Sequence, residues 1–148
     1  MTNKRQVYIQ KQTTITVPFH DVDALHIVWH GHYYKYFEIA RTVLLCAMDY
    51  DYPQMLASSF AWPVIESQCK YRSPLRYGMS VIVQASVVEY IHRLKIEYVV
   101  LLEDTGQRLA NGYTVQVAVD MKTQTLCLNT PSCFREKIEQ AIKQDKKV

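Results

Sequence analysis

The pattern of apolar and polar positions predicts one strand followed by a long helix in the first third of the chain. The strand is expected at residues 7–17, where β-branched and aromatic residues alternate with polar ones before Pro18. From Val28 to Met48, apolar residues recur at steps of three and four, the period of one helical face. Because that face is wide, we expect a helix over residues 31–48 that is largely enclosed. Its polar side is marked by Lys35, Glu38, Arg41 and Thr42.

Four strand-like runs follow the helix after a short irregular or helical piece at residues 53–59. They span residues 62–72, 78–90, 93–103 and 108–121. Short breaks between them favour antiparallel neighbours joined by tight connections, since parallel strands need long crossovers. The last run alternates most clearly. We expect its buried face to carry Leu109, Tyr113, Val115, Val117, Val119 and Met121, and its polar face Ala110, Thr114, Gln116 and Asp120.

The chain ends in a predicted amphipathic helix that starts near Pro131 and carries Phe134, Ile138 and Ile142 on one side. Neither an internal repeat nor a linker rich in glycine and serine divides the sequence, so residues 1–148 are expected to form a single domain. An antiparallel sheet packed on one buried helix satisfies both sets of apolar faces. The expected class is therefore α+β.

Composition and charge narrow the classes of partner. The 148 residues are 49% hydrophobic and 21% charged, enough for one substantial core, and the net charge is +3. Because the basic residues form no dense run, nucleic acid is not an expected partner, whereas an anionic small molecule or an acidic carrier protein would suit the modest positive net charge.

The N-terminus lacks an apolar signal core and no apolar run is long enough to span a bilayer, so we expect a cytoplasmic protein without membrane insertion.

The four cysteines form no CxxC pair and show no spacing typical of zinc, so they are interpreted as reduced thiols. The irregular spacing of His20, His26 and His32 also makes a metal cluster the weaker interpretation. No metal site is expected.

The chemistry is concentrated between Phe19 and Arg41, where two aspartates and several histidines precede the apolar helix. Loops seated on a rigid scaffold commonly carry catalytic groups. The start of a helix supplies unpaired backbone N–H groups and a partial positive charge, which can stabilise a carbonyl oxygen as it gains negative charge. An acid beside such a site can act as a base or as a nucleophile.

This segment contains four short motifs in an ungapped order. They read Asp21-Val22-Asp23, Ile27-Val28-Trp29-His30, Tyr33 and Glu38-Ile39-Ala40-Arg41. Together they resemble the 4-hydroxybenzoyl-CoA thioesterase-like branch of the hotdog superfamily. The resemblance covers about residues 7–122. It implies a hotdog fold, in which an antiparallel five-stranded sheet wraps a long central helix, here with an extra C-terminal helix.

The resemblance also implies a reaction and a set of site residues. Asp23 would be the catalytic carboxylate, acting as general base or nucleophile on an acyl-CoA or acyl-carrier-protein thioester. The backbone amide near His30 would polarise the thioester carbonyl, and Trp29 and Tyr33 would contact substrate. No cofactor is implied, because CoA enters as part of the substrate. A thioester suits this machinery since its thiol leaves without strong acid assistance.

Lys70, Arg72 and Arg76 surround the turn at Ser73-Pro74-Leu75 and would bind the CoA phosphates if the resemblance holds, although a solvated turn would look the same. Asp21 is interpreted as a structural acid, because a second nearby carboxylate would disfavour ionisation of both. Glu38 is the reserve catalytic candidate, and its position three residues before Arg41 also fits a local ion pair.

Three positions depart from the family pattern. Val22 stands where Thr or Cys is common, and His26 stands where a glycine would permit unusual backbone angles. His32 occupies a helix-start position where Asn is common, which leaves the capping of the helix open. These departures keep two alternatives in view: a hotdog dehydratase or hydratase on carrier-bound acyl chains, and a non-catalytic acyl-binding subunit. In each case we expect a homodimer, or a homotetramer formed from two dimers.

Overall fold

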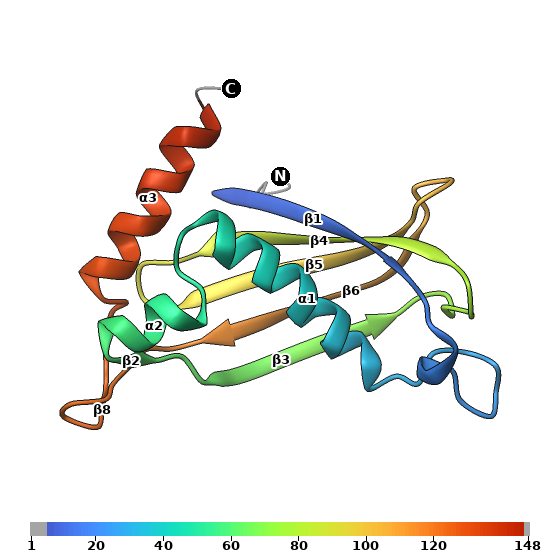
Figure 1. The fold of residues 1–148 in the computed structure, drawn as a ribbon, viewed down its shortest axis with the longest axis horizontal. Helices are drawn as coiled ribbons and strands as arrows, with labels where there is room; N and C mark the ends of the chain where they lie inside the picture. Colours follow the sequence, from blue (N-terminus) through green and yellow to red (C-terminus); the bar gives the residue numbers. More distant parts are fainter. Residues whose placement is uncertain (1–5, 147–148) are drawn as a thin grey trace, which may run out of the picture.

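The computed structural model describes residues 6–146, which form an antiparallel sheet curved around one helix (Figure 1). The five strands of this sheet lie in the order β1-β4-β5-β6-β3. Their bounds are Ile9–Thr16 for β1, Ser80–Glu89 for β4, Leu94–Leu102 for β5, Arg108–Gln116 for β6 and Val64–Tyr71 for β3. Every neighbouring pair is antiparallel. The predicted five-stranded antiparallel sheet is therefore confirmed.

Within residues 6–146, three helices and a second, smaller sheet complete the fold. The central helix α1 spans His32–Ala47, the short α2 spans Tyr52–Ser58 and the C-terminal α3 spans Ser132–Lys146. A single 3-10 turn, η1, covers Phe19–Asp21. The small sheet, which the sequence did not predict, joins β2 (Phe60–Ala61), β7 (Val119–Asp120) and β8 (Thr125–Leu126) in that order.

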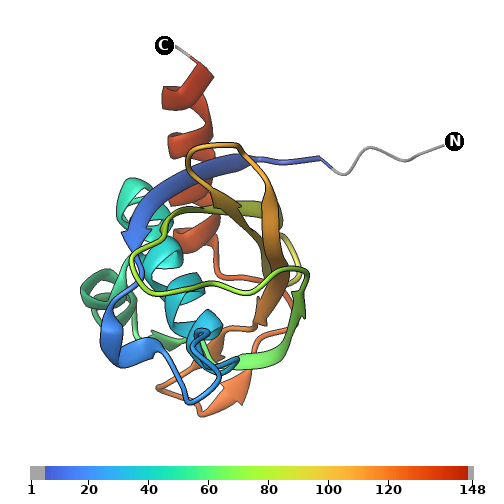
Figure 2. The ribbon, with the colours of Figure 1, turned by 90° about the vertical axis from the view of Figure 1, so that its right-hand side faces the viewer.

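Helix α1 lies inside the curve of the sheet, as the view along the helix shows (Figure 2). Phe37 on α1 stacks on Tyr98 of β5, with ring centroids 4.5 Å apart and an interplanar angle of 5°. Gly112 of β6 leaves room for this stack, because a Cβ there would lie 2.8 Å from the Phe37 ring and 2.2 Å from the Gln68 carbonyl oxygen. The close approach of helix and sheet therefore depends on a glycine.

The prediction that α1 is largely enclosed is wrong on one side. The sheet covers the face of Tyr36, Phe37, Ala40 and Leu44, which are buried. Ile39 and Val43 remain 41% and 36% exposed, and Cys46 is also exposed. A single curved sheet can contact only part of a helix's circumference. The apolar face of α1 is therefore wider than the part of the helix that the sheet covers.

The prediction for the last strand also needs correction. The run expected at residues 108–121 breaks after Gln116, and β7 continues in the small sheet. Thr114 and Gln116, expected on a polar outer face, are buried on the side of α1, while Met121 is 53% exposed. Aromatic rings from α1 and β5 already fill the interior, so the inward side of β6 carries small or hydrogen-bonded residues. Thr114 shows this, since its hydroxyl hydrogen-bonds the Tyr98 hydroxyl at 2.8 Å.

Helix α3 closes one end of the sheet, with Phe134 packed on Trp62 and Tyr50 at centroid distances of 4.7 and 5.4 Å. Phe134 and Ile138 are fully buried, as the amphipathic pattern predicted. Among residues 6–146, none of the helices combines the length and apolar character needed to cross a bilayer.

Strand β3 forms an open edge of the five-stranded sheet. Within residues 6–146 it pairs with β6 on one side only, and seven of its eight residues are exposed. Three of the exposed side chains are large and apolar or aromatic: Val64 at 46%, Ile65 at 58% and Tyr71 at 47%. A long unprotected edge of this kind is a template for pairing with another strand.

Candidate active site

The loop between β1 and α1 is folded back on itself by backbone hydrogen bonds. Val22 and Val28 form an isolated antiparallel bridge, and the Trp29 amide donates to the Asp21 carbonyl oxygen at 3.0 Å. The Val28 amide donates to the carbonyl oxygen of Leu75, at the turn beyond β3, at 2.8 Å. These bonds fix residues 21–29 as a compact hairpin beside the start of α1.

Asp21 anchors this hairpin to the helix. Its side chain is 1% exposed and accepts hydrogen bonds from Lys35 Nζ at 2.5 Å and from the Tyr36 hydroxyl at 2.6 Å. Burial alone would raise the pKa of Asp21, but the two donors together with the charges of Lys35 and His32 lower it below its ordinary value. Both oxygens are bound, which agrees with a structural role for Asp21.

Asp23 lies at the tip of the same hairpin and is half-buried. One carboxylate oxygen, Oδ1, accepts a hydrogen bond from the Leu25 amide at 2.8 Å. This is the local turn contact expected of any loop aspartate. The other oxygen, Oδ2, makes no hydrogen bond to the described part of the chain, so half of the carboxylate remains available to a substrate or a water molecule.

His26 adopts a left-handed backbone conformation, with φ of 65°. Side chains with a Cβ are strained in this region, which glycine occupies freely. The departure at His26 therefore affects the backbone of the turn that holds Asp23. The His26 side chain is exposed and does not line the cleft described next.

A cleft of about 390 Å³ brings Asp23 and His30 together at the N-terminal end of α1. Tyr33, Tyr71 and Arg72 line it as well, and its remaining wall comes from Leu25, Ile27, Val28, Ser73 and Pro74. Burial raises the pKa of Tyr33, which the backbone hydrogen bond to Leu75 only partly offsets, so its phenol stays protonated near neutral pH. Four of the predicted site residues, Asp23, His30, Tyr33 and Arg72, thus share one cleft.

Backbone donors are left unpaired at the start of α1, next to His30 and Tyr33 of the cleft lining. No side chain caps the helix at Gly31, and the amides of His30 and Gly31 donate to no atom within residues 6–146. The carbonyl oxygen of His30 accepts a hydrogen bond from the Tyr71 hydroxyl at 2.8 Å. Free amides and the positive end of the helix dipole would stabilise an oxygen that becomes negative.

The remaining predicted site residues lie outside the cleft lining. Trp29 is 48% exposed and packs against the rings of His30 and His32, with centroids 5.1 and 5.3 Å apart. Lys70 and Arg76 are exposed. Lys70 projects from the face of β3 opposite its neighbours Cys69 and Tyr71, because side chains alternate along a strand. Of the three predicted cations only Arg72 lines the cleft, where its Nε donates to Asn111 Oδ1 at 3.0 Å.

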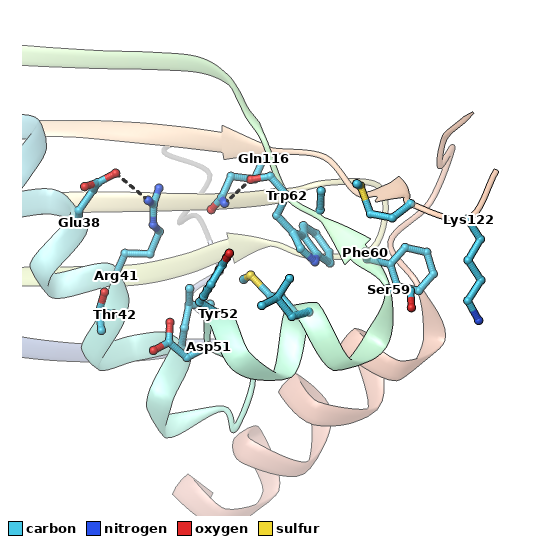
Figure 3. Close-up of a pocket in the computed structure, with 15 residues that line it drawn as sticks. Glu38, Arg41, Thr42, Asp51, Tyr52, Ser59, Phe60, Trp62, Gln116 and Lys122 are labelled. Carbon is cyan, nitrogen blue, oxygen red and sulfur yellow. Dashed lines mark hydrogen bonds and ion pairs between the residues drawn. The ribbon is translucent and has the colours of Figure 1, made fainter. Parts of the chain in front are cut away.

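A second and larger cavity, of about 740 Å³, lies between the second half of α1, α2 and β2 (Figure 3). Glu38 and Arg41 form an ion pair at 3.1 Å on its α1 wall. Glu38, the reserve candidate, therefore faces a different cavity from Asp23. Gln116 lines the same cavity and is 4% exposed. Sequence reasoning missed Gln116, because alternation along the last strand assigned it to an outer face.

Comparison with known proteins assigns the chain to a family. Residues 17–142 match the family model described as the thioesterase-like superfamily. The chain is 26% identical over 125 residues to the Synechocystis protein named "Putative esterase sll0410", covering 82% of this chain and 74% of that one. It is 25% identical to a solved structure titled YbaW Probable Thioesterase from Escherichia coli, with a TM-score of 0.75, covering 88% of this chain and 98% of the other.

A further solved structure shares the fold at lower identity. It is Slr0204 of Synechocystis, a 1,4-dihydroxy-2-naphthoyl-CoA thioesterase, with 17% identity, a TM-score of 0.78, and coverage of 87% of this chain and 95% of the other. The fold is that of the hotdog thioesterases. The chain belongs to the thioesterase-like superfamily, and the predicted enzyme class, a thioester hydrolase, is confirmed.

Proposed function

We propose that this protein hydrolyses an acyl-CoA thioester with the carboxylate of Asp23. The observation that carries the proposal is the shared cleft, in which the half-free carboxylate of Asp23 and the uncapped start of α1 border the same space. A thioester carbonyl needs both kinds of group at once. Its oxygen requires donors as negative charge develops, and its carbon requires an attacking oxygen.

The proposed reaction begins with the thioester oxygen against the amides of His30 and Gly31. Asp23 either takes a proton from the water that attacks the carbonyl carbon, or attacks that carbon itself to give an anhydride that water then cleaves. In both routes the C–S bond breaks, the thiolate leaves and takes up a proton, and a free acid remains. CoA enters only as part of the substrate, and no metal or other cofactor takes part in this proposal.

A second copy of the chain is proposed to complete the site by pairing along β3. The open edge of β3 and its exposed Val64 and Ile65 support this pairing. The Asp23 cleft adjoins the last residue of β3, Tyr71, whereas the larger cavity adjoins Trp62, two residues before the first residue of β3. Eight extended residues separate these ends by roughly 26 Å.

A twofold antiparallel pairing of β3 with its copy would set the end of one strand against the start of the other. The Asp23 cleft of one chain would then face the larger cavity of its partner. In this arrangement the thioester lies at the cleft, the acyl part extends into the partner's cavity, and the thiol arm runs toward Arg72. Pairing of two such dimers would bury the exposed α1 face of Ile39, Val43 and Cys46 in a tetramer.

Thiol release from a panel of acyl-CoA esters tests the reaction. Wild-type protein is expected to turn over at least one ester, and Asp23→Asn to lower kcat by about 100-fold or more while unfolding at the wild-type temperature. Asp104→Asn, an identical change in an exposed turn, serves as the matched control. Near-normal activity of Asp23→Asn would overturn the role of Asp23.

The same panel separates the alternatives. Saturable ester binding without thiol release would favour an acyl-binding subunit, and addition of water to an enoyl-CoA would favour a hydratase. If an acyl group is turned over rapidly on acyl carrier protein and slowly as its CoA ester, the natural carrier is the protein.

The proposed pairing along β3 is tested by comparing the sedimentation of the wild type with that of Ile65→Lys, which puts a charge on the β3 edge. A wild-type monomer would contradict it.

A further inference from the structure

Gln116, on the wall of the larger cavity, carries an enclosed hydrogen-bond acceptor that lacks a donor. Gln116 is 4% exposed, and its Oε1 atom has no hydrogen-bond partner among the residues that the structure describes. Most buried polar atoms in folded proteins are paired, so an unpaired acceptor requires an explanation. Figure 3 shows the Gln116 side chain reaching from β6 toward the side of the cavity where Arg41 lies.

The orientation of this amide is set by a second contact. Gln116 Nε2 donates to the carbonyl oxygen of Trp62 at 2.9 Å. Turning the amide over would bring two carbonyl oxygens together, so the nitrogen must face Trp62 and the oxygen must face away from it. The free group is thus an acceptor by necessity, and only a donor can satisfy it.

The cavity around this acceptor is lined by both polar and apolar residues. The polar residues are Gln116, the Glu38–Arg41 ion pair, Thr42, Asp51, Tyr52, Ser59 and Lys122. The apolar side is built from Leu45, Met55, Leu56, Phe60, Trp62 and Met121. Glu38 neutralises Arg41, and Asp51 balances Lys122 in formal charge, so the lining carries no net charge. A volume of about 740 Å³ is within the usual range for small-molecule sites.

We propose that Gln116 makes this enzyme selective for acyl groups that carry a hydroxyl. The hydroxyl donates to Gln116 Oε1, and the carbon chain packs against the apolar side of the cavity. This inference rests on the proposed function, because the acyl group is taken to enter the cavity of the partner chain. A plain alkyl chain of the same length fills the same space but leaves the acceptor unpaired, and buried unpaired acceptors are unfavourable.

The test compares octanoyl-CoA with its β-hydroxylated and its terminally hydroxylated counterparts. For the wild type, kcat/KM is expected to be about fivefold or more higher for one hydroxylated ester than for octanoyl-CoA. In Gln116→Leu this ratio should fall to about one. Gln84→Leu makes the same change on β4, outside the cavity, and should keep the wild-type ratio.

Two outcomes would overturn the proposal: a wild-type ratio near one for both hydroxylated esters, or an equal loss for all three esters in Gln116→Leu. The second would assign Gln116 to the thiol arm, which all the esters share. Calorimetric binding of the same esters to Asp23→Asn separates this inference from the proposed function. If the wild type hydrolyses no ester, the proposed function fails. The role of Gln116 is still supported if Asp23→Asn binds a hydroxylated ester more tightly than octanoyl-CoA, and if this difference is lost in the double variant Asp23→Asn with Gln116→Leu. Equal binding of all three esters counts against it.

Discussion

The Tyr36 hydroxyl donates a 2.6 Å hydrogen bond to Oδ2 of Asp21, joining the first turns of α1 to the loop that carries Asp23. Lys35 holds the other oxygen of the same carboxylate at 2.5 Å. The loop that carries Asp23 is therefore positioned by one buried aspartate, Asp21, while Asp23, two residues later, borders the cleft.

This arrangement predicts how stability depends on pH. The pKa of Asp21 is lower in the folded state than in the unfolded chain, so its contribution is complete above the unfolded pKa of about 4 and is lost as pH falls through the folded value. Asp21→Asn should lower the free energy of unfolding by about 1–3 kcal/mol at pH 7. It should also flatten the decline below pH ~4 seen in urea titrations of the wild type. An unchanged acid decline in the variant would contradict this role.

Tyr71 is predicted to act as a positioning residue. Its hydroxyl holds the His30 carbonyl at 2.8 Å, and so orients the backbone just before the free amides at the helix start. Tyr71→Phe should lower kcat by about tenfold, because misaligned donors stabilise the developing oxyanion less well. KM should change less than kcat. Tyr77→Phe, in the exposed turn nearby, should leave both constants unchanged. A rise in KM with unchanged kcat would instead indicate a substrate contact.

The backbone at His26 gives a third prediction. Because its φ is 65°, His26→Val should destabilise the fold by about 1–2 kcal/mol. His26→Gly should leave the unfolding free energy unchanged or raise it by up to about 1 kcal/mol. Chemical denaturation of the three proteins measures these differences. If valine were tolerated as well as histidine, the left-handed conformation would not be a constraint.

Gly112 gives a prediction about packing. A Cβ at this position would lie 2.2 Å from the Gln68 carbonyl oxygen and 2.8 Å from Phe37, so Gly112→Ala must push β3 or α1 outward. We expect a loss of about 2–3 kcal/mol. At Gly106 nothing lies within 4 Å of the added carbon, although φ is +74°. Gly106→Ala should therefore cost only about 1 kcal/mol, and equal losses at the two sites would argue against the steric explanation.

Much of this fold could be predicted from local patterns. The sequence shows a clear helical period between Val28 and Met48 and clear strand patterns beyond it. These patterns are clear because each element buries a continuous apolar face. The order of the motifs from Asp21 to Arg41 then indicated the family, and the structure brings Asp23 and His30 to one cleft.

Other features depend on contacts between distant elements and could not be predicted. Gln116 was assigned to an outer face because polar residues usually face water, but the rings of Phe37 and Tyr98 fill the interior and leave β6 an inward side of small and polar residues. The exposed face of Ile39 and Val43 likewise follows from how far one sheet can curve around a helix. Lys70 does not line the cleft with Arg72, because Lys70 lies within β3 on the face opposite Tyr71, whereas Arg72 follows the end of the strand and is not bound to its alternation.

The open strand β3, with a cleft at one end and a cavity at the other, has a consequence for stoichiometry. In the proposed dimer each chain donates its acid to one reaction centre and its acyl receptor to the other. Two inactive proteins, one lacking the Asp23 carboxylate and one with an obstructed cavity, would thus form a mixed dimer with one intact centre. Random pairing makes about half of the dimers mixed, so genetic complementation between such alleles would restore about a quarter of the activity, although neither allele works alone.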